Sequence, residues 1–140
     1  MKEKNISVDH IGIATKSLDE SDIFWKMLGF VQEMDDELVE EQGVKVRYLS
    51  SPNSDLNHTR IELLEPTGDE TPIGRFLSKK GPGVQQICIR VENLKETLEI
   101  LLNSGIELID KTPKKGAGGA LIAFIHPKST GGVLVELSQH

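Results

Sequence analysis

The sequence predicts an α+β fold built from two tandem βαβββ modules, and three observations lead to this expectation. Residues 8–30 align without gaps with residues 84–106, and six of the aligned positions are identical. Both copies place a helix start directly after a strand pattern, and further strand patterns follow each helix. We therefore expect one domain over residues 1–140, with module one at about 6–66, a linking helix at about 71–80 and module two at about 83–138.

Each copy begins with a strand, at about 7–14 and 84–91, and continues into a helix. Ser17 and Asn93 can cap the first free N–H groups of these helices, and a glutamate follows each of them three residues later. Gly29 and Gly105 stand where a helix ends in a left-handed cap. The later strands are expected at about 30–38, 44–50 and 59–65, and at about 106–111, 120–126 and 132–138.

Composition excludes several classes of function. The net charge of −6 and the lack of a basic stripe with interleaved aromatic residues argue against a nucleic-acid partner. No signal peptide or long apolar run is present, so we expect no membrane association. Cys88 is the single cysteine and cannot form an intrachain disulfide, which suits a reducing, cytoplasmic location.

Four polar side chains interrupt otherwise apolar strands at repeated positions. Neighbouring residues of a strand point to opposite faces, so His10 and Glu62 point away from the apolar face of module one. Gln86 and Glu136 occupy the matching positions of module two. If the modules close together, one imidazole and three oxygen donors meet, a set that suits one divalent ion of Mg, Mn, Co, Ni or Zn.

The sequence resembles the methylmalonyl-CoA epimerase family of the vicinal oxygen chelate superfamily, which also includes glyoxalase I. The resemblance covers nearly the whole chain in order. Its motifs are Val8-Asp9-His10-Ile11-Gly12-Ile13-Ala14, Glu41-Gln42-Gly43-Val44, Ile61-Glu62-Leu63-Leu64-Glu65-Pro66, the glycine-rich run from Pro113 to Gly119, and the stretch from Phe124 to Leu137 with His126-Pro127-Lys128 and Glu136-Leu137.

This resemblance implies an open, cupped mixed sheet around one metal held by His10, Glu62, Gln86 and Glu136. The chain departs from the family at two positions. Gln86 stands where the family usually has histidine, and a glutamine oxygen binds Zn²⁺ or Co²⁺ more weakly than imidazole does. Val46 stands where some members have a glutamate proposed to accept the proton.

The implied activity is interconversion of methylmalonyl-CoA stereoisomers, by removal of the α-proton to give a metal-stabilised enolate. Glu136 is the first candidate for the general base, and Glu40 and Glu41 are weaker candidates. Lys114 and Lys115 are expected to bind the acyl-CoA substrate together with Gly116 and Gly119. Relatives are commonly dimers, so a homodimer is also expected.

Three alternatives stay open from the sequence. A lyase of the glyoxalase I type, acting on a glutathione hemithioacetal, uses a similar site and the same enolate chemistry. A non-catalytic small-molecule-binding protein of this fold would hold a ligand without reaction. An iron dioxygenase of the superfamily needs two histidines and one carboxylate, and only His10 stands at a ligand position.

Overall fold

The structure is a computed structural model that describes residues 5–52 and 59–140. The chain forms two compact units, one of His10–Gln85 and one of Gln86–His140 together with the residues that precede His10. Each unit contains one βαβββ module, so the predicted pair of modules is confirmed. Among the described helices, none is both long and apolar enough to cross a membrane.

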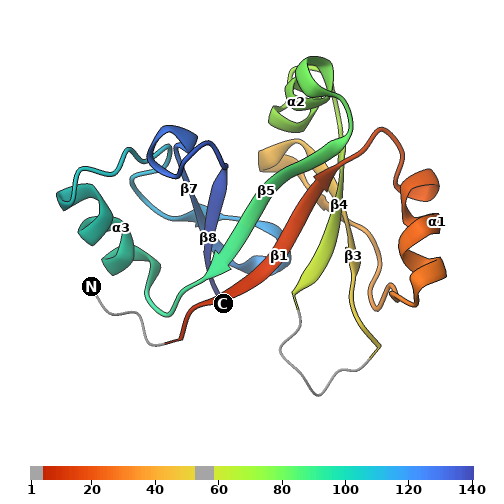
Figure 1. The fold of residues 1–140 in the computed structure, drawn as a ribbon, viewed down its shortest axis with the longest axis horizontal. Helices are drawn as coiled ribbons and strands as arrows, with labels where there is room; N and C mark the ends of the chain where they lie inside the picture. Colours follow the sequence, from red (N-terminus) through yellow and green to blue (C-terminus); the bar gives the residue numbers. More distant parts are fainter. Residues whose placement is uncertain (1–4, 53–58) are drawn as a thin grey trace. The chain divides into compact units, whose positions relative to one another are not determined.

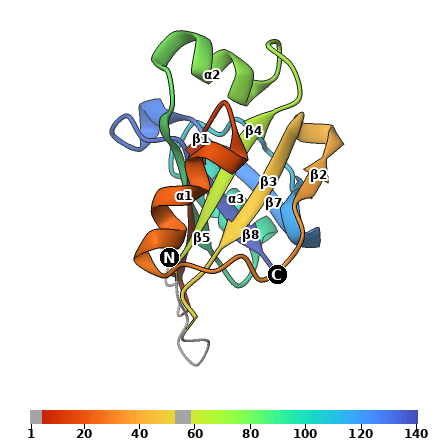
Figure 2. The same ribbon diagram turned by 90° about the vertical axis from the view of Figure 1, so that its right-hand side faces the viewer.

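The first unit carries a four-stranded sheet in the order β2-β3-β4-β1. Strands β1 and β4 are parallel, while β2–β3 and β3–β4 pair antiparallel (Figures 1 and 2). Its elements are β1 (Ser7–Ala14), α1 (Leu18–Leu28), β2 (Glu37–Val39), the 3-10 helix η1 (Glu40–Gln42), β3 (Val44–Leu49), β4 (Arg60–Pro66) and α2 (Pro72–Lys80).

The second unit repeats this arrangement in the order β5-β8-β7-β6. Strands β5 and β8 are parallel, and β8–β7 and β7–β6 are antiparallel. Its elements are β5 (Gly83–Arg90), α3 (Leu94–Asn103), β6 (Lys114–Lys115), the 3-10 helix η2 (Ala117–Gly119), β7 (Leu121–Ile125), the 3-10 helix η3 (Pro127–Ser129) and β8 (Val135–Gln139).

The predicted helix caps are present in the structure. The side chain of Ser17 accepts a hydrogen bond from the backbone N–H of Glu20, and Asn93 accepts the equivalent bond from Glu96. Gly29 ends α1 with a φ of 115°, in the region that favours glycine. In helix α2, Thr71 is the cap and proline occupies the first position.

Each unit buries one apolar face of its sheet under a helix. In the first unit, Leu18 of α1 packs with Leu49, Ile61 and Leu63 from β3 and β4. In the second unit, the core consists of α3 residues packed on β7 and β8: Leu94, Leu98, Leu108, Ala123, Ile125 and Leu137 with Val91. The side chains that alternate with these strand residues point to the opposite face, where the polar candidates lie.

Two strand predictions are wrong in extent. The strand expected at about 30–38 is only Glu37–Val39, with an isolated bridge between Val31 and Ser50. Gln32 and Asp36 instead make side-chain hydrogen bonds that replace a strand ladder. The strand expected at about 106–111 is reduced to a bridge between Leu108 and Ile125, and Lys114–Lys115 pairs with β7 in its place.

Candidate active site

His10 and Glu62 meet on the polar face of the first unit. His10 lies on β1 opposite Arg60 of the adjacent parallel strand β4, and Glu62 stands two residues further along β4. The Nδ1 atom of His10 is 3.0 Å from Oε2 of Glu62. Both side chains are almost fully buried, at 6% and 2% exposure. Burial of an imidazole and a carboxylate is costly unless they are paired or bind a cation, which makes this pair a candidate functional group.

Arg60 and Tyr48 extend this polar face. The Nη2 atom of Arg60 is 2.9 Å from the same carboxylate oxygen of Glu62. The Arg60 guanidinium also lies over the ring of Tyr48, 5.1 Å from the ring centroid. Tyr48 stands on β3 directly opposite Glu62. The carboxylate of Glu62 is therefore surrounded by one imidazole, one guanidinium and one aromatic ring.

The hydroxyl of Tyr48 donates a hydrogen bond to the carboxylate of Glu37 on β2. Burial raises the pKa of Tyr48 well above its usual value, and the hydrogen bond to Glu37 and the negative charges of Glu62 and Glu37 act in the same direction. Tyr48 therefore stays protonated as a donor at neutral pH. Glu37 itself is partly buried and stands opposite Val46 in the β2–β3 register.

Gln86 and Glu136 form the corresponding pair in the second unit. The side-chain amide of Gln86 donates a 2.8 Å hydrogen bond to Oε1 of Glu136. Both are buried, at 7% and 5% exposure, on the parallel strands β5 and β8. Because the amide N–H group binds Glu136, the amide oxygen of Gln86 is the atom that could serve as a metal ligand.

The four predicted ligands thus occur as two buried pairs, one in each unit. Their donors are one imidazole nitrogen, two carboxylates and one amide oxygen, a set that fits a divalent ion of the Mg, Mn, Co, Ni or Zn type. Convergence of all four groups on one ion stays a prediction.

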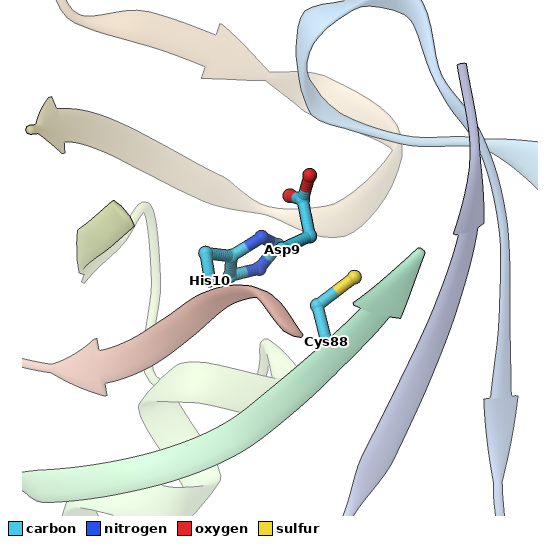
Figure 3. Close-up of side chains that lie close together, drawn as sticks. All are labelled: Asp9, His10 and Cys88. Atoms are coloured by element: carbon cyan, nitrogen blue, oxygen red, sulfur yellow. The ribbon is translucent and has the colours of Figure 1, made fainter. Parts of the chain in front are cut away.

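Asp9 and Cys88 are a further buried pair in the second unit. Their potential ligand atoms lie within 4.8 Å of each other, and Figure 3 shows both side chains together with His10, the next residue along β1. Asp9 also lies 3.1 Å from Arg90 and 3.4 Å from His140. The guanidinium of Arg90 balances the charge of Asp9, so this ion pair accounts for the burial of the carboxylate.

The predicted substrate-binding residues lie at the edge of the second unit. Lys114 and Lys115 form the exposed strand β6, with Gly116 and Gly119 at the adjoining η2 turn. The ammonium of Lys114 is 3.2 Å from Asp110. This partner reduces the positive charge that Lys114 can offer to a phosphate.

The weaker base candidates, Glu40 and Glu41, lie in η1 and are exposed to solvent. Exposed carboxylates are common on protein surfaces, so the surroundings of Glu40 and Glu41 give no reason to assign either of them as a proton acceptor.

Arg47 anchors the strand that carries Tyr48. Its guanidinium binds Asp36 through two hydrogen bonds of 2.8 and 2.7 Å and Asp22 through one of 2.8 Å. The hydrogen bonds from Arg47 hold the pKa of Asp36 below its usual value. Burial opposes ionisation of Asp22, but Lys26 and Arg47 outweigh it and its pKa is also lowered. This network ties α1 and the segment before β2 to β3.

Sequence reasoning missed Glu37, Tyr48 and Arg60 as members of the polar face. Arg60 could have been found, because it stands two residues before Glu62 and must share its face. Tyr48 lies within the strand expected at about 44–50, but nothing in the sequence around it marks it as a site residue. Glu37 carries no local signal, because its position depends on the register between β2 and β3.

Comparison with known proteins places these observations in a family context. Residues 9–124 match the model of the glyoxalase/bleomycin resistance protein/dioxygenase superfamily. A mitochondrial methylmalonyl-CoA epimerase from Dictyostelium discoideum is 40% identical over 94% of this chain and 77% of its own length. The uncharacterised protein YqjC from Bacillus subtilis is 38% identical over 94% of this chain and 91% of its own length.

Solved structures agree with the sequence matches. A methylmalonyl-CoA epimerase variant from Streptomyces coelicolor, in complex with 2-nitronate-propionyl-CoA, superposes with a TM-score of 0.87 at 34% identity. The match covers 95% of this chain and 93% of that one. The predicted fold class is therefore confirmed.

Proposed function

From the premise that this chain belongs to the glyoxalase/bleomycin resistance/dioxygenase superfamily, and within it to the methylmalonyl-CoA epimerase family, we propose that it is an epimerase that interconverts the stereoisomers of methylmalonyl-CoA. The enzyme class rests on the epimerases among its relatives.

One structural observation carries the proposal. Two buried polar pairs, His10–Glu62 and Gln86–Glu136, occupy duplicated positions on parallel strand pairs of the two units. A non-catalytic binding protein has no use for four buried side chains that can ligate a metal, because burying these polar groups costs free energy. An enzyme that must stabilise negative charge uses such donors directly.

The reaction removes the proton on the carbon between a thioester and a carboxylate. A divalent ion held by His10, Glu62, Gln86 and Glu136 would supply a Lewis acid for the negative charge that develops on oxygen. The protein's own carboxylates move the proton, and Glu136 is the candidate base from the second unit. Arg60 and His10 hold the carboxylate of Glu62 in a fixed orientation.

The acyl-CoA substrate also carries phosphates, and we propose that Lys115, Lys114 and the glycine-rich η2 turn bind them. Lys115 is exposed on β6. A glycine-rich backbone turn beside an exposed lysine is a common phosphate-binding arrangement.

The glyoxalase I reaction is the second candidate, because it passes through the same type of enolate. The epimerases among the relatives favour the first reaction. A direct comparison of methylmalonyl-CoA with a glutathione hemithioacetal distinguishes the two.

The test is deuterium uptake at the α-carbon of methylmalonyl-CoA in D₂O, followed by NMR with chiral analysis of the product. The protein is loaded separately with Co²⁺, Mn²⁺, Mg²⁺, Ni²⁺ and Zn²⁺, and a sample without enzyme gives the background. We expect metal-dependent uptake that falls by roughly 100-fold or more in Glu136→Gln. Turnover of the hemithioacetal without α-carbon exchange would assign the protein to glyoxalase chemistry instead.

Two further expectations stay predictions. A homodimer would show twice the mass of the 15.5 kDa chain in light scattering after gel filtration. A cytoplasmic location would place the protein in the soluble fraction of its own cells, away from secreted material.

A further inference from the structure

We propose that the hydroxyl of Ser138 is a substrate-binding group, and that it holds an amide of the pantetheine arm of an acyl-CoA thioester. The inference rests on the proposed function, because that function supplies the acyl-CoA. Pantetheine is a flexible chain of methylene groups interrupted by amides, and it joins the thioester to the phosphates. Neither the four candidate metal ligands nor the lysines of β6 account for this part of the substrate.

The hydroxyl of Ser138 is buried and has no hydrogen-bond partner within the described part of the chain. Ser138 lies on β8 at 3% exposure. No described residue makes a hydrogen bond with its Oγ atom. A buried hydroxyl without a partner costs free energy, so folded proteins retain few of them, and functional sites are a common place for those that remain. The hydroxyl of Ser138 therefore has the capacity to bind a polar group of a ligand.

Strand alternation places this hydroxyl beside the candidate active site. Ser138 and Glu136 are two residues apart on β8, so their side chains point to the same face. Leu137, between them, points to the opposite face and packs in the core with residues of α3. The rise along a strand separates the positions of Ser138 and Glu136 by roughly 6.5 Å. A group held by Ser138 therefore belongs to a part of the ligand next to the reacting carbon.

The same face leads from Ser138 to the proposed phosphate-binding edge. Ile122 of β7 stands opposite Ser138, and Lys114 of β6 stands opposite Ile122. Adjacent strands are about 4.8 Å apart, so this row spans roughly 10 Å across the second unit. Phe124 stands opposite Glu136 in the next row, and Nζ of Lys114 lies 5.2 Å from the centroid of its ring. A largely apolar surface with one polar group suits the pantetheine chain.

The charges around Ser138 favour a neutral polar group over an anion. Arg90 stands opposite Ser138 on β5, and its guanidinium is 3.1 Å from Asp9. Lys114 is 3.2 Å from Asp110. Both cations of this row already have carboxylate partners, so burying the substrate carboxylate here would cost free energy that an amide does not cost. A hydroxyl matches either end of an amide, because it donates to the oxygen or accepts from the N–H group.

The test compares two methylmalonyl thioesters that differ in one group. The N-acetylcysteamine thioester contains the pantetheine amide that is nearest to the sulfur, and the S-pentyl thioester has methylene groups in its place. Isothermal titration measures binding of both to the full-length, metal-loaded wild type and to Ser138→Ala. We expect the ratio of the two affinities, amide over pentyl, to be about fivefold to tenfold larger in wild type than in Ser138→Ala.

Two further variants and a stability measurement complete the design. Ser104→Ala removes an exposed hydroxyl that donates to the backbone oxygen of Ile100, and should leave the affinity ratio unchanged. Ser138→Cys keeps a side chain of similar size with a weaker donor, and should give an intermediate ratio. Ser138→Ala should melt at the wild-type temperature or above it, because it removes a buried hydroxyl without a partner. A merely structural hydroxyl would lower the melting temperature when removed.

The outcomes separate this inference from the proposed function, because binding and α-proton exchange in D₂O are measured independently. A wild type that prefers the amide thioester through Ser138, but exchanges no α-proton with any metal, would contradict the epimerase assignment and support the role of Ser138. An active wild type whose affinity ratio is unchanged in Ser138→Ala would overturn only the role of Ser138. A Ser138→Ala variant that is less stable and loses affinity for both thioesters equally would overturn it as well. A wild type that binds neither thioester nor methylmalonyl-CoA would overturn both proposals.

Discussion

The side-chain amide of Gln86 donates a 2.8 Å hydrogen bond to Glu136 between the parallel strands β5 and β8. In the matching place of the first unit, the imidazole of His10 faces Glu62 at 3.0 Å. The duplicated positions therefore both hold a nitrogen-bearing side chain beside a glutamate, an imidazole in one unit and an amide in the other. Metal affinity is the property that this difference should affect most directly.

Gln86→His should strengthen zinc binding by about tenfold or more, because imidazole is a better zinc ligand than an amide oxygen. Gln86→Leu should weaken binding and leave Glu136 without its amide donor. Isothermal titration with Zn²⁺ and Mg²⁺ measures both effects. Equal zinc affinity in wild type, Gln86→His and Gln86→Leu would show that residue 86 is not a ligand.

Arg47→Met should lower the free energy of unfolding by on the order of 3 kcal/mol at neutral pH. The substitution leaves the buried carboxylate of Asp22 and the partly buried carboxylate of Asp36 without their guanidinium partner. Methionine fills a similar volume, so the loss reports the ion pairs more than packing. Urea unfolding gives the difference, and Lys79→Met on the exposed end of α2 is the control. An equal effect of the two substitutions would contradict this account.

The same network predicts a loss of stability in acid. The pKa values of Asp22 and Asp36 are lower in the folded protein than in the unfolded chain, so unfolding takes up protons. Their stabilising contribution is complete above the ordinary value of about 3.8 and disappears as the pH falls through the lower folded values. The stability gap between wild type and Arg47→Met should therefore narrow below about pH 4. A gap that stays constant down to about pH 2 would refute the linkage.

Gly74→Ala should destabilise the protein although alanine is the better helix former. A Cβ atom at this position of α2 would lie 2.2 Å from the backbone oxygen of Gly68, so the start of the helix would have to move. Thr71 holds both sides of this contact, because its hydroxyl donates to Gly68 and accepts from the N–H of Gly74. We expect a net loss of about 1–3 kcal/mol after the helix-propensity gain of about 1 kcal/mol.

Thermal unfolding of Gly74→Ala measures this loss, with Ser78→Ala on the exposed side of the same helix as the control. A rise in the melting temperature of Gly74→Ala would show that the helix start adjusts at no cost.

Local sequence signals were sufficient for much of the fold. The caps at Ser17 and Asn93 depend on neighbouring residues alone, and both are confirmed. The internal repeat located both modules, because a repeat can be seen in the sequence without knowledge of contacts between distant residues.

Elements that depend on distant partners were not predictable in the same way. Asp110 uses its carboxylate to accept the N–H of Phe124, which replaces a ladder bond of the strand expected at about 106–111. Asp36 similarly binds Arg47 instead of continuing a strand. The same distinction applies to the candidate site. The alternation of side chains between the two faces of a strand identified His10 and Glu62, whereas the position of Glu37 depends on the register between β2 and β3.

The short outer strands have a consequence for association of the folded chain. β2 has three residues and ends the strand order of the first unit, and β6 has two lysines and ends that of the second. A second polypeptide can extend a sheet only where several unpaired backbone groups lie in a row, and repulsion between lysines opposes such growth. Both outer edges thereby resist fibril-like extension of the sheet by a further polypeptide.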